Sequence, residues 1–202
     1  MSSRRARERW RSKLWITVYA PPYFGDAKIA YIPVTDPKKA VGRVIETTLY
    51  DLIGQDMKYY SIKLYFKITE IDEEKKVART IFKGHEYARE YLRSLVRRRT
   101  SMVDFIKDYR TKDGYVVRIF TVAFTQYRIN TSKKHKIRLI ADRILSEKVP
   151  NMTYDQLAHA LVLEKLASDI LSEAKKIARI RHLGIRKSKL IKVPEEQVMK
   201  LA

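Results

Sequence analysis

The spacing of apolar residues changes once along this chain, near residue 132, and this change limits the folds open to it. Up to about residue 125 the apolar positions mostly follow the period of β-strands, in which alternate residues face a core. After residue 132 they recur every three or four positions, which is the period of an amphipathic helix. The two patterns together predict an α+β fold.

Several strands are expected in the first part of the chain. The clearest alternation lies at residues 59–71, where Ile62 and Leu64 point to one side and Lys63 and Tyr65 to the other. The strongest hairpin signal is Asp-Gly at residues 113–114, because both residues tolerate positive φ between two β-rich runs. The remaining candidate strands are residues 14–19, 28–34, 43–50 and 77–83, and residues 72–75 are expected to form a turn.

Three helices are expected. Residues 86–99 place apolar side chains on one side and arginines at the carboxyl end, where the helix dipole favours cations. A second helix follows residue 132 and ends before Pro150. Thr153 and Gln156 have the form of a capping box, which predicts a third helix from there to about residue 174. Residues 180–192, rich in β-branched side chains, favour a final strand.

The domain organisation follows from these patterns. No Gly-, Ser- or Pro-rich linker divides the chain, so we expect a single α+β domain at residues 14–193. Its sheet is expected to be antiparallel and closed or nearly closed, like a β-barrel, and to be covered by several helices. Residues 1–13 have too few apolar side chains to pack and predict a flexible basic arm, and residues 194–202 are expected to form a C-terminal tail.

The net charge of +20 is confined to four short segments. They are residues 1–13, 97–99, 133–138 and 175–192, and together they carry the whole excess, so the rest of the chain is neutral. Charge that only aids solubility is scattered, with both signs interspersed. Four basic clusters on a neutral background therefore indicate a polyanionic partner, with nucleic acid favoured over an anionic membrane surface.

The residues do not favour an enzyme. Cysteine is absent, which excludes disulfides, thiolate metal sites and a cysteine nucleophile, and no phosphate-binding glycine motif occurs. The four histidines are far apart in sequence, and His159 is expected to pack among apolar neighbours. His135 and His182 lie in basic runs and are expected to contact phosphate or water. We therefore predict no catalytic residue, no metal site and no cofactor.

The basic clusters also lack the spacing of a DNA-reading motif. Cations spread over an arm, a helix end, a helix start and a terminal segment suit a folded RNA, which is recognised by shape and backbone. Trp10 could stack on a base or tuck against the domain. No apolar run approaches the roughly 18 residues of a membrane span, and the basic N-terminus lacks the apolar stretch of a signal peptide. We expect a soluble, intracellular RNA-binding protein.

Five segments resemble one ribosomal family. They are TKDGYVVR at residues 111–118 followed by FTVAF at 120–124, WITVYAP at 15–21, GRVIE at 42–46, KHKIR at 134–138 and IRKSK at 185–189. These segments span nearly the whole chain. By this resemblance the chain is identified as a member of the archaeal and eukaryotic small-subunit ribosomal protein family S-one-e, in older naming S-three-A-e. The chain is shorter than eukaryotic members, which favours the archaeal branch.

The resemblance implies a structural, non-catalytic protein of the small ribosomal subunit. It implies binding to small-subunit rRNA on the platform near the mRNA exit region, in the cytoplasm, beside other small-subunit proteins, with mRNA as a further candidate contact. The alternative is a free RNA-binding or chaperone-like protein outside the ribosome.

The residues predicted to contact RNA are basic side chains of the four clusters, with one aromatic and one histidine. They are Arg4, Arg5, Arg7, Arg9, Trp10, Arg11 and Lys13; Arg97, Arg98 and Arg99; Lys133, Lys134, His135, Lys136 and Arg138; and Arg179, Arg181, Arg186, Lys187 and Lys189.

Overall fold

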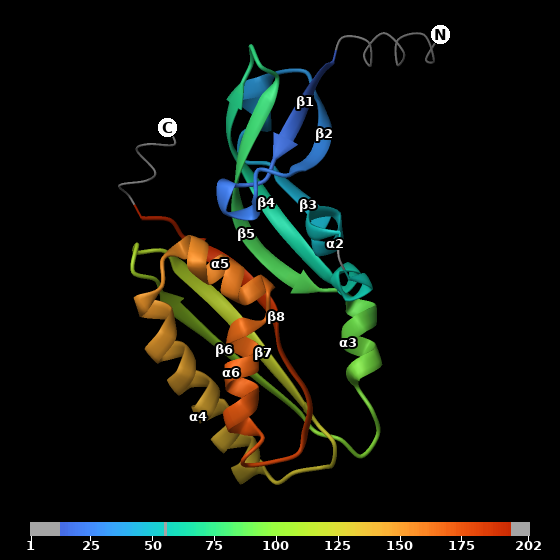
Figure 1. The fold of residues 1–202 in the computed structure, drawn as a ribbon, viewed down its shortest axis with the longest axis vertical. Helices are drawn as coiled ribbons and strands as arrows, with labels where there is room; N and C mark the ends of the chain where they lie inside the picture. The colour runs from blue at the N-terminus through green and yellow to red at the C-terminus, as the bar shows by residue number, and fades with distance from the viewer. Residues whose placement is uncertain (1–12, 55, 195–202) are drawn as a thin grey trace.

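Eight strands form one mixed sheet that divides into two halves between β5 (Val77–Tyr87) and β8 (Ile180–Lys192) (Figure 1). This computed structural model describes residues 13–54 and 56–194. The first half holds β1 (Leu14–Tyr19), β2 (Lys28–Val34), β3 (Val44–Thr48), β4 (Ile62–Asp72) and β5. The second half holds β6 (Met102–Arg110), β7 (Val116–Thr125) and β8.

The strand order is β2-β1-β5-β8-β7-β6, with β4 also on β5 and β3 on β4. All pairs are antiparallel except β1 with β5, which run parallel. The expectation of a closed or nearly closed barrel is wrong, because the sheet stays open. β5 pairs with β4 along its whole length but with β8 at only one registered position, Glu86 opposite Lys187. The two halves therefore diverge from this joint and do not wrap round to meet.

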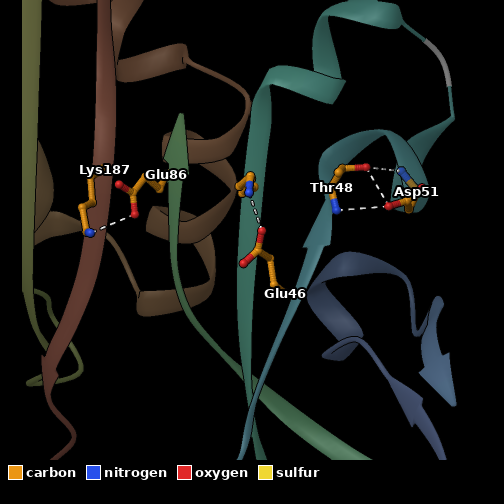
Figure 2. Close-up of polar contacts among 6 residues, drawn as sticks. Glu46, Thr48, Asp51, Glu86 and Lys187 are labelled. Carbon is orange, nitrogen blue, oxygen red and sulfur yellow. Dashed lines mark hydrogen bonds and ion pairs between the residues drawn. The ribbon is translucent and has the colours of Figure 1, made fainter. Parts of the chain in front are cut away.

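Polar contacts from Glu86 and His85 hold the joint between β5 and β8. The Lys187 ammonium lies 2.8 Å from the Glu86 carboxylate (Figure 2). The buried His85 ring bridges the strands, with its Nε2 2.9 Å from the carbonyl oxygen of Ile185 and its Nδ1 2.7 Å from Ser188 Oγ. Gly84 permits this close approach, since a Cβ there would lie 2.1 Å from the Ser188 carbonyl oxygen.

The three longer helices cover one face of the second half (Figure 1). They are α4 (Thr131–Lys148), α5 (Tyr154–Val162) and α6 (Lys165–Ala174). Of these, α5 also contacts β5 of the first half. Ile137, Ala141 and Leu145 of α4 pack into the main core with Val117 and Ile119 of β7. The first half has a separate small core around Ile16, Val18 and Ile68. None of the helices in the described ranges is long and apolar enough to span a membrane.

Short helices fill the connections. They are α2 (Leu49–Ile53), α3 (Arg89–Leu95) and the 3₁₀ turns η1 (Pro22–Phe24), η2 (Pro37–Ala40), η3 (Met57–Ser61) and η4 (Val149–Asn151). A reciprocal capping box opens α2, in which Thr48 and Asp51 exchange backbone and side-chain hydrogen bonds (Figure 2). The expected capping box at Thr153 and Gln156 is confirmed at the start of α5.

Most local predictions are confirmed, and several boundaries are wrong, including the end of the strand expected at residues 77–83, which continues to Tyr87. The hairpin of β6 and β7, the helix α4, the turn before β5 and the final strand β8 all occur as expected. The strand expected at residues 43–50 ends at Thr48, where the capping box starts α2, and the strand expected from residue 59 begins only at Ile62, after η3. The helix expected at residues 86–99 is shortened, because β5 continues through Tyr87 and α3 ends at Leu95.

The helix expected to run from residue 153 to 174 is two helices. Glu164 takes a left-handed backbone conformation with φ of 56° and separates α5 from α6. This break turns α6 away from the line of α5 over the sheet (Figure 1). The expected arm and tail lie outside the described residues, apart from Lys13 and Pro194.

Candidate nucleic-acid interface

Two of the four basic clusters, and the first residues of a third, meet at one end of the second half of the sheet. Met102 at the start of β6 pairs with Phe124 at the end of β7, and Thr125 pairs with Ile180 at the start of β8. The segments joined to these strand ends are residues 97–101, 126–130 and 175–179, and α4 begins beside them (Figure 1). We call this region, with Arg97, Arg98, Arg99, Arg128, Lys133, Lys134 and Arg179, the basic end.

An open hollow of about 710 Å³ lies in the basic end. Arg99, Arg128 and Lys134 line it from three separate segments, and the described lining contains no carboxylate. Tyr127 also lines the hollow and is 63% exposed. Three cations and an open aromatic ring around one concave surface provide what a phosphate and an unstacked base require.

A buried hydrogen-bond network fixes the two loops of the hollow relative to each other. The backbone N–H of Ser101 donates to Thr125 Oγ1 at 3.0 Å, and the backbone N–H of Thr125 donates to the Ser101 carbonyl at 3.0 Å. The backbone N–H of Ile129 donates to Ser101 Oγ at 3.2 Å. Because Ser101 and Thr125 are buried, Arg99 and Arg128 start from anchored backbone. Arg99 itself has φ of +60°, a left-handed turn that carries the chain into β6.

The amino end of α4 adds to the positive potential of the basic end. Asn130 caps α4 without a side-chain hydrogen bond, and no acidic residue lies in its first turn. The unpaired N–H groups of a helix start carry partial positive charge, so they add to the field of Lys133 and Lys134. An anionic partner is therefore favoured by backbone and side chains alike.

The cations of the basic end have no ion-pair partner among the residues that the structure describes. Arg97, Arg98, Arg99, Arg128 and Lys134 form no ion pair with any residue in the described ranges. Four cations of the second half outside the basic end do have ion pairs, which are Lys107 with Asp142, Arg118 with Asp108, Arg138 with Asp104 and Lys148 with Asp169. The cations around the hollow are therefore available to an anionic partner.

Comparison of the sequence with known proteins shows to which family this chain belongs. The Ribosomal S3Ae family model matches residues 1–194. The chain belongs to the Ribosomal S3Ae family. Small ribosomal subunit protein eS1 of Staphylothermus marinus is 44% identical over 188 residues, which cover 93% of this chain and 87% of that protein. The protein of the same name from Sulfurisphaera tokodaii is 42% identical over 195 residues, 96% of this chain and 100% of its own.

In this S3Ae-family chain the predicted RNA-contacting residues are not equally available. Arg97, Arg98, Arg99, Lys133, His135, Lys136, Arg179 and Lys189 are exposed. Lys134 is half-buried and lines the hollow, and Lys13 is half-buried beside β1. Arg4, Arg5, Arg7, Arg9, Trp10 and Arg11 lie outside the described residues.

Four predicted residues already have partners inside the protein. Arg181 donates to the Leu95 carbonyl, and Arg138 donates from Nε to the Asp104 carbonyl at 2.9 Å. Lys187 pairs with Glu86, and the Arg186 guanidinium lies 5.7 Å from the centre of the Phe120 ring. These contacts hold β8 and α4 against their neighbours. The four side chains therefore stabilise the fold, in addition to any contact that they make with RNA.

Two histidine predictions have different outcomes. His159 packs as expected, with its ring stacked 5.2 Å from that of Phe24. His182 was expected to face phosphate or water, but β8 turns it inward among Tyr87, Tyr91 and Phe124. Burial lowers the pKa of His182, so its neutral form is favoured.

Arg128 and Tyr127 are the residues that sequence reasoning missed. Arg128 stands alone between two basic runs, so a search for clusters passes over it. The signal that could have found it is an Arg beside an aromatic residue in the short loop between a predicted strand and a basic helix start. Among the described residues no group of His, Asp and Glu is arranged to hold a metal ion.

Proposed function

We propose that this S3Ae-family chain is a structural component of the small ribosomal subunit that binds rRNA through its basic end. Membership of the family and relatives named as small ribosomal subunit protein eS1 support the ribosomal role. The observation that carries the RNA contact is the convergence of unpaired cations from three segments around the hollow. The role is architectural and involves no chemical step.

The proposed binding is electrostatic, with geometry supplied by the sheet. Arg99 and Arg128 offer planar forks that suit two phosphate oxygens each, while Lys134 acts as a point charge at the start of α4. Tyr127 presents an open ring on which one unpaired base can stack. The anchored Ser101 and Thr125 keep these groups at fixed separations, so little ordering is required on binding.

The location within the subunit is a further part of the proposal. By family resemblance the chain lies on the platform near the mRNA exit region, in the cytoplasm, beside other small-subunit proteins and within reach of mRNA. The basic arm at residues 1–13 adds positive charge, and this segment becomes ordered when it binds rRNA during assembly.

The test compares two triple variants that lower the net charge equally. One carries Arg99→Gln, Arg128→Gln and Lys134→Gln in the hollow. The control carries Lys107→Gln, Arg118→Gln and Lys148→Gln, whose cations are paired with Asp142, Asp108 and Asp169. Affinity of each full chain for small-subunit rRNA is measured over a series of salt concentrations, with circular dichroism as the check on folding.

The hollow variant is expected to lower the slope of log affinity against log salt by about 2, since each phosphate contact contributes roughly 0.7 to 0.9. The control variant is expected to change the slope by much less, because its cations already have partners. Equal slopes for the two variants, or a larger loss in the control, would refute the basic end as the rRNA contact.

A further inference from the structure

A second cavity, of about 610 Å³, lies where η3, the start of α3 and the end of α5 come together. The carboxylates of Glu90 and Glu164 line it, and no Lys or Arg side chain does so among the described residues. The nearby Lys63 on β4 is held by Glu46 at 2.7 Å (Figure 2). In a chain with a net charge of +20, the described lining of this cavity carries carboxylates and no Lys or Arg.

The walls of the cavity are apolar and open. Met57 is 77% exposed, Tyr60 is 52% exposed and Leu163 is 39% exposed, and all three line it. Tyr60 is held by a stacked contact with Tyr50 at 4.3 Å between ring centres. Exposed large apolar side chains grouped around one hollow are typical of a surface that a partner covers.

The carboxylate of Glu164 is held in place. Its left-handed backbone, with φ of 56°, fixes the break between α5 and α6, and its side chain accepts a hydrogen bond from the Tyr87 hydroxyl. Tyr91, which also lines the cavity, packs edge-on against Tyr87 at 5.3 Å. A fixed anion beside aromatic faces is an arrangement that attracts a guanidinium or an ammonium group.

We propose that this cavity binds an Arg or Lys side chain on a basic segment of a neighbouring protein. Phosphates are repelled by the carboxylates of Glu90 and Glu164, so RNA does not suit the cavity. The apolar walls formed by Met57, Tyr60 and Leu163 suit the carbon stem of the cation and an apolar residue next to it. This inference rests on the proposed function in one respect, which is that the partner is expected to be another protein of the small subunit.

The test places a photo-crosslinking residue, p-benzoylphenylalanine, at one of two methionines in the full chain. One probe replaces Met57 in the acidic cavity, and the other replaces Met102, which lines the hollow of the basic end. Small subunits are reconstituted with each chain and irradiated, and the attached molecules are identified by mass spectrometry. A third chain with the probe at Leu163 samples the acidic cavity from α5.

The probes at Met57 and Leu163 are expected to attach to a protein, at a peptide with Lys or Arg within two residues of the link. The probe at Met102 is expected to attach to rRNA. Attachment of the Met57 or Leu163 probe to rRNA, to a peptide without a cation, or to nothing would overturn the inference while leaving the basic end intact. Failure of the Met102 probe to reach rRNA would count against the proposed function instead.

A charge reversal tests the carboxylates directly. Glu90→Arg, combined with the Leu163 probe, is expected to lower the crosslink yield at least about tenfold, since like charges placed together disfavour a contact strongly. Glu74→Arg, at the exposed turn between β4 and β5, is the matched control and is expected to leave the yield unchanged. Equal yields in the two variants would show that charge does not select the partner.

Discussion

The His85 joint between β5 and β8 predicts a specific dependence of stability on pH. His85 is buried, and desolvation lowers its pKa from the ordinary 6.5 to about 4, although its hydrogen bond to Ile185 opposes the shift. The ring is therefore neutral in the folded protein, where Nε2 donates to the Ile185 carbonyl and Nδ1 accepts from Ser188. In the unfolded chain the same ring takes up a proton below pH 6.5.

The sign and size of the effect follow from these two pKa values. Between pH 6.5 and 4 the unfolded state binds a proton that the folded state does not, so the free energy of unfolding decreases as the pH falls. Each pKa unit corresponds to about 1.4 kcal/mol, so the loss attributable to His85 approaches about 3 kcal/mol by pH 4 and then levels off. Above pH 7 the contribution is constant.

His85→Gln tests this reasoning, because the amide keeps a hydrogen-bond donor but cannot be protonated. Urea unfolding followed by circular dichroism at pH 7, 5.5 and 4, at constant ionic strength, gives the stability of each chain. The difference between wild type and variant should shrink by about 3 kcal/mol from pH 7 to pH 4. His135→Gln, on the exposed face of α4, is the control. Parallel pH curves for wild type and His85→Gln would refute the account of the joint.

Two other substitutions probe the fold. Gly84→Ala should destabilise the protein by about 3 kcal/mol or more, because a Cβ would meet the Ser188 carbonyl and φ is +149°. Gly25→Ala, with φ of +79° and open space around it, should cost only about 1 kcal/mol, and equal losses in urea unfolding would contradict the close approach. Thr153→Ala should remove the capping box with Gln156 and cost about 1 kcal/mol, so an unchanged urea midpoint would contradict the cap's contribution.

Local signals predicted the elements that depend on local chemistry. Asp113-Gly114 specified the hairpin, and the Thr153 capping box specified the start of α5, because each acts within a few residues. The end of β5 was missed, since Glu86 and Tyr87 are kept in a strand by pairing with β4 and by the contact with β8. The open sheet was missed for the same reason, because closure depends on which distant edges meet.

The candidate site was predicted in part. The basic clusters were visible in the sequence, but their meeting at one end requires the pairing of β6, β7 and β8. Arg128 and Tyr127 were missed, because neither belongs to a basic cluster in the sequence and only the folded chain brings them beside Arg99 and Lys134. The inward turn of His182 likewise follows from the register of β8 against β7, which no short-range pattern specifies.

The measurement that tests the central proposal most directly is sedimentation of native cell lysate through a sucrose gradient at high salt. Each fraction is probed for this chain and for small-subunit rRNA. The account predicts that the chain migrates with the small subunit in stoichiometric amounts and remains there after the high-salt wash. A chain found at the top of the gradient, apart from the subunit, would contradict the ribosomal role and favour a free RNA-binding protein.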